Sequence, residues 1–194
     1  MTSYAFELRR YVGRIDQFDR RDWLVYVAWV GLMVGLTLST LGAVWFVHRV
    51  EAPAPANTWL IPIGAFIFTV AIAVDTIGHR TIYKEAIARA EGLVHGITIF
   101  CGIGSCVLLC AAFEARALFF IPATVLTILS FVYSLVDEVF HWHRYWTQNS
   151  DPVEMWAHLG ILIGHGTMMG AWWLWAWEGY PGVAEALAVL SSGG

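Results

Sequence analysis

The sequence predicts an all-α membrane protein: a polytopic helix bundle of five transmembrane helices with an internal repeat of two hairpins. Of the 194 residues, 58% are hydrophobic and only 13% are charged, about half the charged share of soluble domains. The mean hydropathy, +0.62, is also high. A net charge of −4 leaves little basic surface to bind phosphates, so we expect no nucleic-acid partner.

Five stretches are long enough to cross a hydrocarbon core, which takes about 20 helical residues. The first, residues 23–47, contains no Asp, Glu, Lys or Arg, and the second passes through Asp75 to His79. A connection with two prolines, residues 51–57, separates these two spans and fits an extended loop. The five predicted spans are residues 23–47, 59–79, 93–113, 117–136 and 155–177.

Three segments follow from these spans. Residues 1–22 mix aromatic residues with arginines and predict an amphipathic helix on the membrane surface. Residues 23–178 form one five-helix domain, and residues 179–194 form a C-terminal tail without a motif.

Lysine and arginine are unevenly distributed between the two sides of the predicted bundle. With a cytoplasmic N-terminus, nine of the 11 lie on the inner side, and only Arg49 and Arg116 lie on the outer side. Cytoplasmic loops carry the excess of positive charge in membrane proteins. We therefore expect an integral protein of a prokaryotic inner or plasma membrane, with its N-terminus in the cytoplasm.

Pairs of an acid and a histidine, four residues apart, occur at the ends of the last four spans. The four pairs are Asp75 and His79, Glu91 and His95, Asp137 and His141, and Glu154 and His158. Because corresponding pairs recur after 62 or 63 residues, the sequence predicts two repeated hairpins, residues 59–113 and 117–177. Positions i and i+4 share one helical face. All eight side chains are thus expected in one layer near the cytoplasmic face.

Such a layer is typical of a metal site, because isolated charges are costly in a membrane. Imidazole and carboxylate ligands on facing helices hold dinuclear centres. Eight ligands suffice for two metal ions; Glu91 and Glu154 either bind metal or orient the histidines. Glu138 is a further candidate ligand, and His165 is a candidate ligand or gate. A proton relay and hydrogen bonds that fasten helices are the alternatives to metal binding.

The arrangement resembles the C subunit of copper-dependent membrane monooxygenases, the group of particulate methane, ammonia and short-alkane monooxygenases. The resemblance rests on two motifs, Asp75-x-x-x-His79 followed by His95 and Asp137-Glu138-x-x-His141 followed by His158. It covers residues 60–178 and implies copper, dioxygen and a multi-subunit assembly. The additional carboxylates favour a harder ion, so ligand chemistry indicates iron, and zinc is also compatible.

The leading functional hypothesis is a membrane monooxygenase or desaturase with a dinuclear non-haem centre and an apolar, lipid-like or hydrocarbon substrate. It needs dioxygen and an external electron donor, since the sequence has no flavin fingerprint or thiolate cluster. No residue is assigned as catalytic. The alternatives are a zinc-dependent intramembrane hydrolase and a non-enzymatic haem or electron-transfer subunit. Both homo- and hetero-oligomers are compatible with the sequence.

Overall fold

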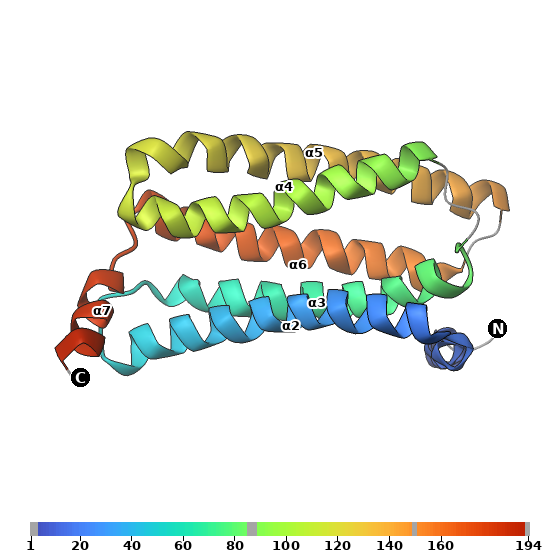
Figure 1. Ribbon diagram of the computed structural model, residues 1–194, viewed down its shortest axis with the longest axis horizontal. Helices are drawn as coiled ribbons and strands as arrows, with labels where there is room; N and C mark the ends of the chain where they lie inside the picture. Colours follow the sequence, from blue (N-terminus) through green and yellow to red (C-terminus); the bar gives the residue numbers. More distant parts are fainter. Residues whose placement is uncertain (1–3, 85–88, 149–150, 193–194) are drawn as a thin grey trace.

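A computed structural model describes the backbone of residues 4–84, 89–148 and 151–192, with all side chains there except those of residues 89–91 and 148. Within these ranges all regular structure is helical. Five long helices lie side by side, and α1 and α7 lie at opposite ends of the bundle (Figure 1). The elements are α1 (Tyr4–Val12), η1 (Gly13–Gln17), α2 (Arg20–Arg49), η2 (Ala56–Trp59), α3 (Leu60–Thr81), α4 (Arg89–Glu114), α5 (Arg116–Gln148), α6 (Pro152–Trp177) and α7 (Val183–Ser192).

Four segments are long and apolar enough to cross a membrane: Arg20–Arg49, Ala56–Thr81, Gly92–Glu114 and Arg116–Thr147. They correspond to the first four predicted spans. The fifth predicted span is helical, as α6, but its histidines, glycines and tryptophans lower its hydropathy, and it is not among the four. Helix α5 also continues well past the predicted end at residue 136, because the polar residues that follow remain helical.

The two terminal segments are partly helical. Residues 1–22 contain α1 and η1, and Asp19 then begins α2 with a capping box formed with Asp22. Tyr11 of α1 is fully buried and lies directly against Gly78 of α3, which fixes the terminal segment to the bundle. Residues 179–194, predicted as a tail without a motif, contain the helix α7.

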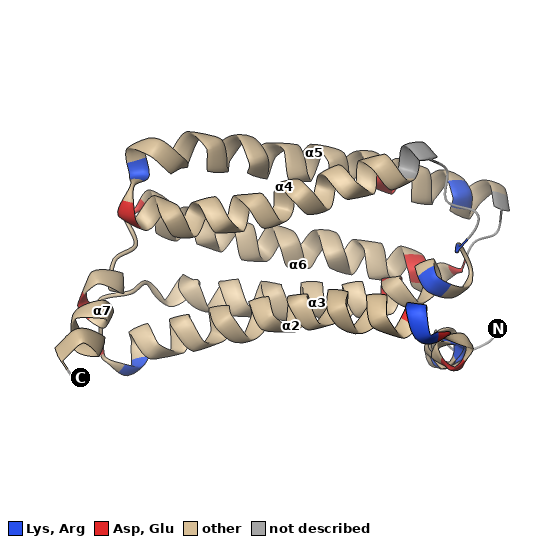
Figure 2. Ribbon diagram, viewed as in Figure 1, with Lys and Arg blue, Asp and Glu red and all other residues tan. Residues whose placement is uncertain are grey.

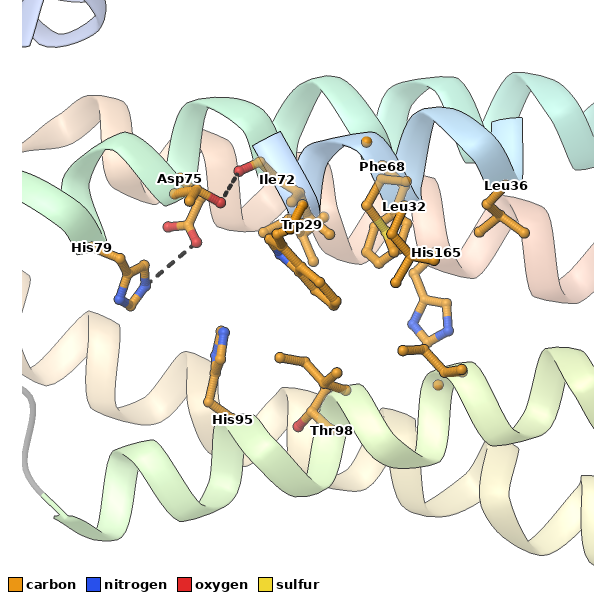
Figure 3. A pocket seen from close by; sticks show the side chains of 18 of the residues that line it. Trp29, Leu32, Leu36, Phe68, Ile72, Asp75, His79, His95, Thr98 and His165 are labelled. Atoms are coloured by element: carbon orange, nitrogen blue, oxygen red, sulfur yellow. Dashed lines mark hydrogen bonds and ion pairs between the residues drawn. The ribbon is translucent and has the colours of Figure 1, made fainter. Parts of the chain in front are cut away.

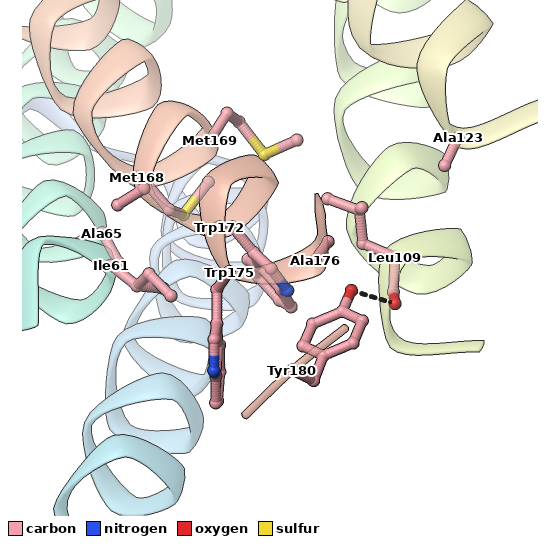
Figure 4. Packing of buried hydrophobic residues seen from close by; sticks show 11 residues of the cluster. Ile61, Ala65, Leu109, Ala123, Met168, Met169, Trp172, Trp175, Ala176 and Tyr180 are labelled. Carbon is pink, nitrogen blue, oxygen red and sulfur yellow. Dashed lines mark hydrogen bonds between the residues drawn. The ribbon is translucent and has the colours of Figure 1, made fainter. Parts of the chain in front are cut away.

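The long helices are arranged as two closely packed pairs. Helix α3 packs along α6, and α4 packs along α5 over a comparable length, while α2 covers α3. The two pairs contact each other at far fewer positions, where α6 meets α4 and α5. At the C-terminal end a cluster of large apolar side chains fills the space between the pairs (Figure 4). Tyr180 joins the pairs there, because its hydroxyl donates to the carbonyl oxygen of Leu109 at 2.6 Å.

Glycines allow α3 and α6 to approach backbone to backbone. A Cβ atom on Gly64 would lie 2.7 Å from the carbonyl oxygen of Gly164, and one on Gly164 would lie 2.8 Å from Cα of Phe68. Both distances are shorter than a Cβ atom tolerates. Small residues at helix contacts are a common means of packing helices in membranes, so this contact sets the separation of α3 and α6.

Charged residues lie near the two ends of the bundle, and most of the described basic residues share the end that carries α1 (Figure 2). Asp22 of α2 is buried there and accepts hydrogen bonds from Arg80 at 2.9 Å and from Lys84 at 2.7 Å. The hydrogen bond to Asp22 raises the pKa of the Lys84 ammonium group. These ion pairs join α2 to the end of α3.

Candidate metal centre

Six of the predicted ligands, the aspartates and the histidines, meet inside the bundle, near the end that carries α1. Both pairs of helices contribute, since the side chains come from α3, α4, α5 and α6. Four of the six are buried, His79 is partly buried, and the His95 side chain is 36% exposed. We call this set the polar cluster: Asp75, His79, His95, Asp137, His141 and His158.

The first half of the polar cluster is centred on Asp75. Its Oδ2 atom lies 3.4 Å from Nε2 of His79, one turn further along α3. Its Oδ1 atom lies 3.1 Å from Nε2 of His158 on α6. Asp75, His79 and His158, the Asp75 group, thus place one carboxylate between two imidazoles.

The second half is centred on Asp137 and has the same composition. Oδ2 of Asp137 lies 3.2 Å from Nδ1 of His95 on α4 and 3.7 Å from Nε2 of His141 on α5. Asp137, His95 and His141 form the Asp137 group. Each aspartate therefore contacts the histidine four residues later and a histidine from the other predicted hairpin.

The two groups adjoin. Nitrogen atoms of His79, His141 and His158 lie within 4.8 Å of one another, and the ring centroids of His141 and His158 are 3.5 Å apart. Among the described residues, Nε2 of His79, Nε2 of His158 and Oδ1 of Asp75 are buried, and their contacts within the Asp75 group lack the geometry of hydrogen bonds. A buried polar atom without a hydrogen bond is costly. Convergent atoms of this kind fit a metal ion, which accepts the lone pairs of all three.

Comparison with known proteins does not indicate the chemistry of this site. The chain matches no family model, curated protein or solved structure. The donor set is therefore the basis for any assignment: four imidazoles and two carboxylates on four helices.

Two glutamates contact the Nδ1 atoms of two histidines in the polar cluster. Oε1 of Glu138 lies 3.1 Å from Nδ1 of His158, and Oε1 of Glu154 lies 2.8 Å from Nδ1 of His141. Histidines that bind metal typically donate their second N–H to a carboxylate, which fixes the ring. The contacts of Glu138 with His158 and of Glu154 with His141 have this arrangement. The side chain of Glu91 lies outside the described residues.

Tyr83 and Arg144 belong to the same network and were missed by sequence reasoning. The Tyr83 hydroxyl donates to Oε2 of Glu154, and Arg144 donates to Oε1 of Glu154 at 3.1 Å. Arg144 also lies above the Tyr83 ring, 4.5 Å from its centroid. The spacing of Arg144, three residues after His141, was a signal that the two share a helical face.

Glutamine at position 154 tests the role of this carboxylate. Glu154→Gln keeps the shape of the side chain but removes the charge that faces Arg144 and His141. Because hydrogen bonds to charged groups contribute about 1.5–3 kcal/mol, we expect the free energy of unfolding to fall by about 2 kcal/mol. Chemical unfolding in detergent measures the loss. Glu178→Gln, at an exposed position, is the matched control, and an equal loss in both variants would contradict the assigned role.

An apolar cavity of about 1160 Å³ adjoins the polar cluster, with Asp75, His79, His95, Asp137 and His158 in its wall. Trp29, Leu32 and Leu36 of α2 and Phe68 and Ile72 of α3 also line it (Figure 3). His165 also lines this cavity, at a distance from the polar cluster (Figure 3). It does not belong to the converging group of His79, His141 and His158.

Proposed function

We propose that the protein is an integral membrane oxidoreductase that hydroxylates or desaturates an apolar substrate at a dinuclear non-haem metal centre. One observation carries the proposal. The Asp75 group and the Asp137 group each offer two histidines and one carboxylate, and they adjoin in the wall of an apolar cavity. Two histidines and one carboxylate with open positions are typical of non-haem iron oxygenases.

The donor set supports iron as the metal. Ions held by the two groups would supply the activation of dioxygen. The residues of the chain then have three tasks: the aspartates and histidines hold the ions, Glu138 and Glu154 fix two imidazole rings, and the apolar wall excludes water. In the copper-dependent family that the sequence resembles, the motifs would pair Asp75 and His79 with His95.

The bundle is proposed to cross the membrane five times, with α6 as the fifth span. Helix α6 has 26 residues, enough for a hydrocarbon core about 30 Å thick, and it packs along α3. The similar packing of α3 on α6 and of α4 on α5 supports the internal repeat. The basic end of the bundle would face the cytoplasm, so a donor protein would deliver electrons to the end that holds the polar cluster.

The substrate is proposed to enter the cavity from the bilayer between α2 and α4. Both helices line the cavity, yet in the described ranges no Cα atom of α2 comes within 8 Å of one in α4. Leu32 of α2 and Val107 of α4 line the cavity and are also exposed. A lateral opening bordered by apolar side chains suits a hydrocarbon or lipid-like chain.

A zinc-dependent hydrolase is the second candidate, and one observation favours it. His79, His141 and His158 form a group of three converging nitrogen donors, as catalytic zinc sites with three histidines do. A haem subunit fits less well, because carboxylates lie within 3.1–3.7 Å of the imidazoles on both sides, where a porphyrin needs apolar space.

Elemental analysis and oxygen uptake of the purified protein in detergent test the proposal together. We expect close to two iron ions per chain and oxygen uptake when an artificial electron donor is supplied. Zinc as the sole metal, without oxygen uptake, would overturn the proposal in favour of the hydrolase. A Soret band would assign the histidines to haem, and a protein without stoichiometric metal would also overturn it.

A further inference from the structure

His165 is a buried imidazole in the wall of the cavity that the metal centre does not use. His165 is only 6% exposed and lies in the middle of α6, among apolar residues. Its ring is stacked between Phe131, with centroids 4.6 Å apart, and Phe68, with centroids 5.4 Å apart. In the parts of the chain that the structure describes, no hydrogen bond or ion pair reaches it, and its ring nitrogens are not among the fully buried atoms without a partner, so they are open to the cavity.

A buried imidazole has one N–H donor and one lone pair, and leaving them unpaired costs free energy that apolar packing does not return. The two phenylalanine rings hold the imidazole by its faces, so the polar edge remains available to the cavity. In Figure 3 this edge lies beyond Trp29 as seen from Asp75 and His79. The missing partner of His165 would therefore be a ligand in the cavity.

The surroundings define the chemistry of this ligand. The described cations that line the cavity, Arg80 and Lys84, belong to its other end, beyond His79 on the chain. Near His165 lie the apolar side chains of Leu32, Leu36 and Phe68, which also line the cavity (Figure 3). An anionic group would have no counter-charge there, whereas a neutral oxygen needs only a hydrogen bond.

Resting on the proposed function, we infer that His165 recognises a hydroxyl or carbonyl oxygen on an otherwise apolar substrate. His165 follows His158 by seven residues, which places it about 10 Å further along the helix axis. Phe68 precedes Asp75 by the same number of residues, so the two helices keep the same offset. Holding the oxygen at His165 would fix which carbon of the substrate lies beside the polar cluster.

Gly102 of α4 provides the space for such a ligand. The offset of 63 residues that relates His95 to His158 also relates Gly102 to His165. A Cβ atom on Gly102 would meet nothing within 4 Å, and Gly102 lines the same cavity. The two hairpins thus differ at this position: one offers a hydrogen-bonding ring and the other offers room.

The test compares three probes of equal chain length: decane, 1-decanol and 2-decanone. The full-length protein in lipid nanodiscs is titrated with each probe, and binding is corrected for partition into empty nanodiscs. We expect the wild type to bind the alcohol and the ketone about tenfold more tightly than decane, because one neutral hydrogen bond contributes up to about 1.5 kcal/mol. Comparison of the alcohol with the ketone shows which oxygen is preferred.

His165→Phe is the decisive variant, because it keeps a flat ring between Phe68 and Phe131 and removes both nitrogens. It should bind all three probes as weakly as the wild type binds decane, with unchanged metal content. His143→Phe, at an exposed position, should keep the wild-type preference. Gly102→Leu, which fills the cavity, should weaken binding of all three probes alike.

The outcomes separate this inference from the proposed function. It is overturned if the wild type binds no probe, if it shows no preference for an oxygen, or if His165→Phe keeps the preference. If the preference depends on His165 but the protein holds no metal, the recognition site is supported and the oxidoreductase is rejected.

Discussion

Alanine at His79 is expected to remove one metal ion per chain and to abolish oxygen uptake. The imidazole is one of three donors in the Asp75 group, and its Nε2 atom converges with those of neighbouring histidines. A site that loses one of three protein ligands retains the ion poorly, and sites of two metal ions about 3.5–4 Å apart act as one unit. Elemental analysis gives the stoichiometry, and His143→Ala, outside the polar cluster and exposed, should retain both ions.

Double variants show which histidines share an ion. His158 contacts Asp75, whereas His95 contacts Asp137. We therefore expect His79→Ala combined with His158→Ala to lose a single ion, and His79→Ala combined with His95→Ala to lose both. The reverse result would mean that each hairpin builds its own site, as the resemblance implies, and would contradict the grouping by contacts.

Alanine at Gly164 is expected to lower the free energy of unfolding by about 3 kcal/mol, the upper part of the usual range for overpacking. The new methyl group would meet backbone atoms of Phe68 in α3, which cannot rotate away as the end of a flexible side chain can. Helix α6 must then shift away from α3, and His158 would move away from Asp75. Chemical unfolding in detergent measures the stability, and the metal content should fall in the same variant.

The same helix provides two controls. A Cβ atom on Gly166 or Gly170 would meet nothing within 4 Å, and alanine is the better helix former. Gly166→Ala and Gly170→Ala should therefore be as stable as the wild type or slightly more stable. A loss in these variants equal to that of Gly164→Ala would show that the effect comes from helix α6 itself rather than from its contact with α3.

Hydropathy located the long helices, because a run of apolar residues identifies a span regardless of which helix lies beside it. Helix α5 extends to Gln148, beyond the apolar stretch of residues 117–136, because a helix continues through polar residues that face a partner. The contact between α3 and α6 had a signal that was not used: Gly160 and Gly164 are four residues apart, the spacing that allows close helix approach in membranes.

Spacing along the chain also explains how much of the polar cluster could be anticipated. A spacing of four positions from acid to histidine places both on one face, and this predicted Asp75 beside His79 and Asp137 near His141. Which helix lies opposite is not encoded in that spacing. The contact between Asp75 and His158 therefore required the structure, and so did the contact of Glu154 with Tyr83. Both depend on α3 packing along α6 rather than along its sequence neighbour α4.

The exchange of partners between the two hairpins has a consequence for biogenesis. The Asp75 group lies within the packed pair of α3 and α6, and the Asp137 group lies within the pair of α4 and α5. Each ligand group therefore joins side chains from both hairpins. Neither hairpin can assemble a ligand group while it is alone in the membrane. The Asp137 group is complete once α5 has followed α4, whereas the Asp75 group is complete only after α6 has inserted. Each bound ion would then join the two hairpins. A chelator should accordingly loosen the end of the bundle near α1 and leave the end closed by Tyr180 intact.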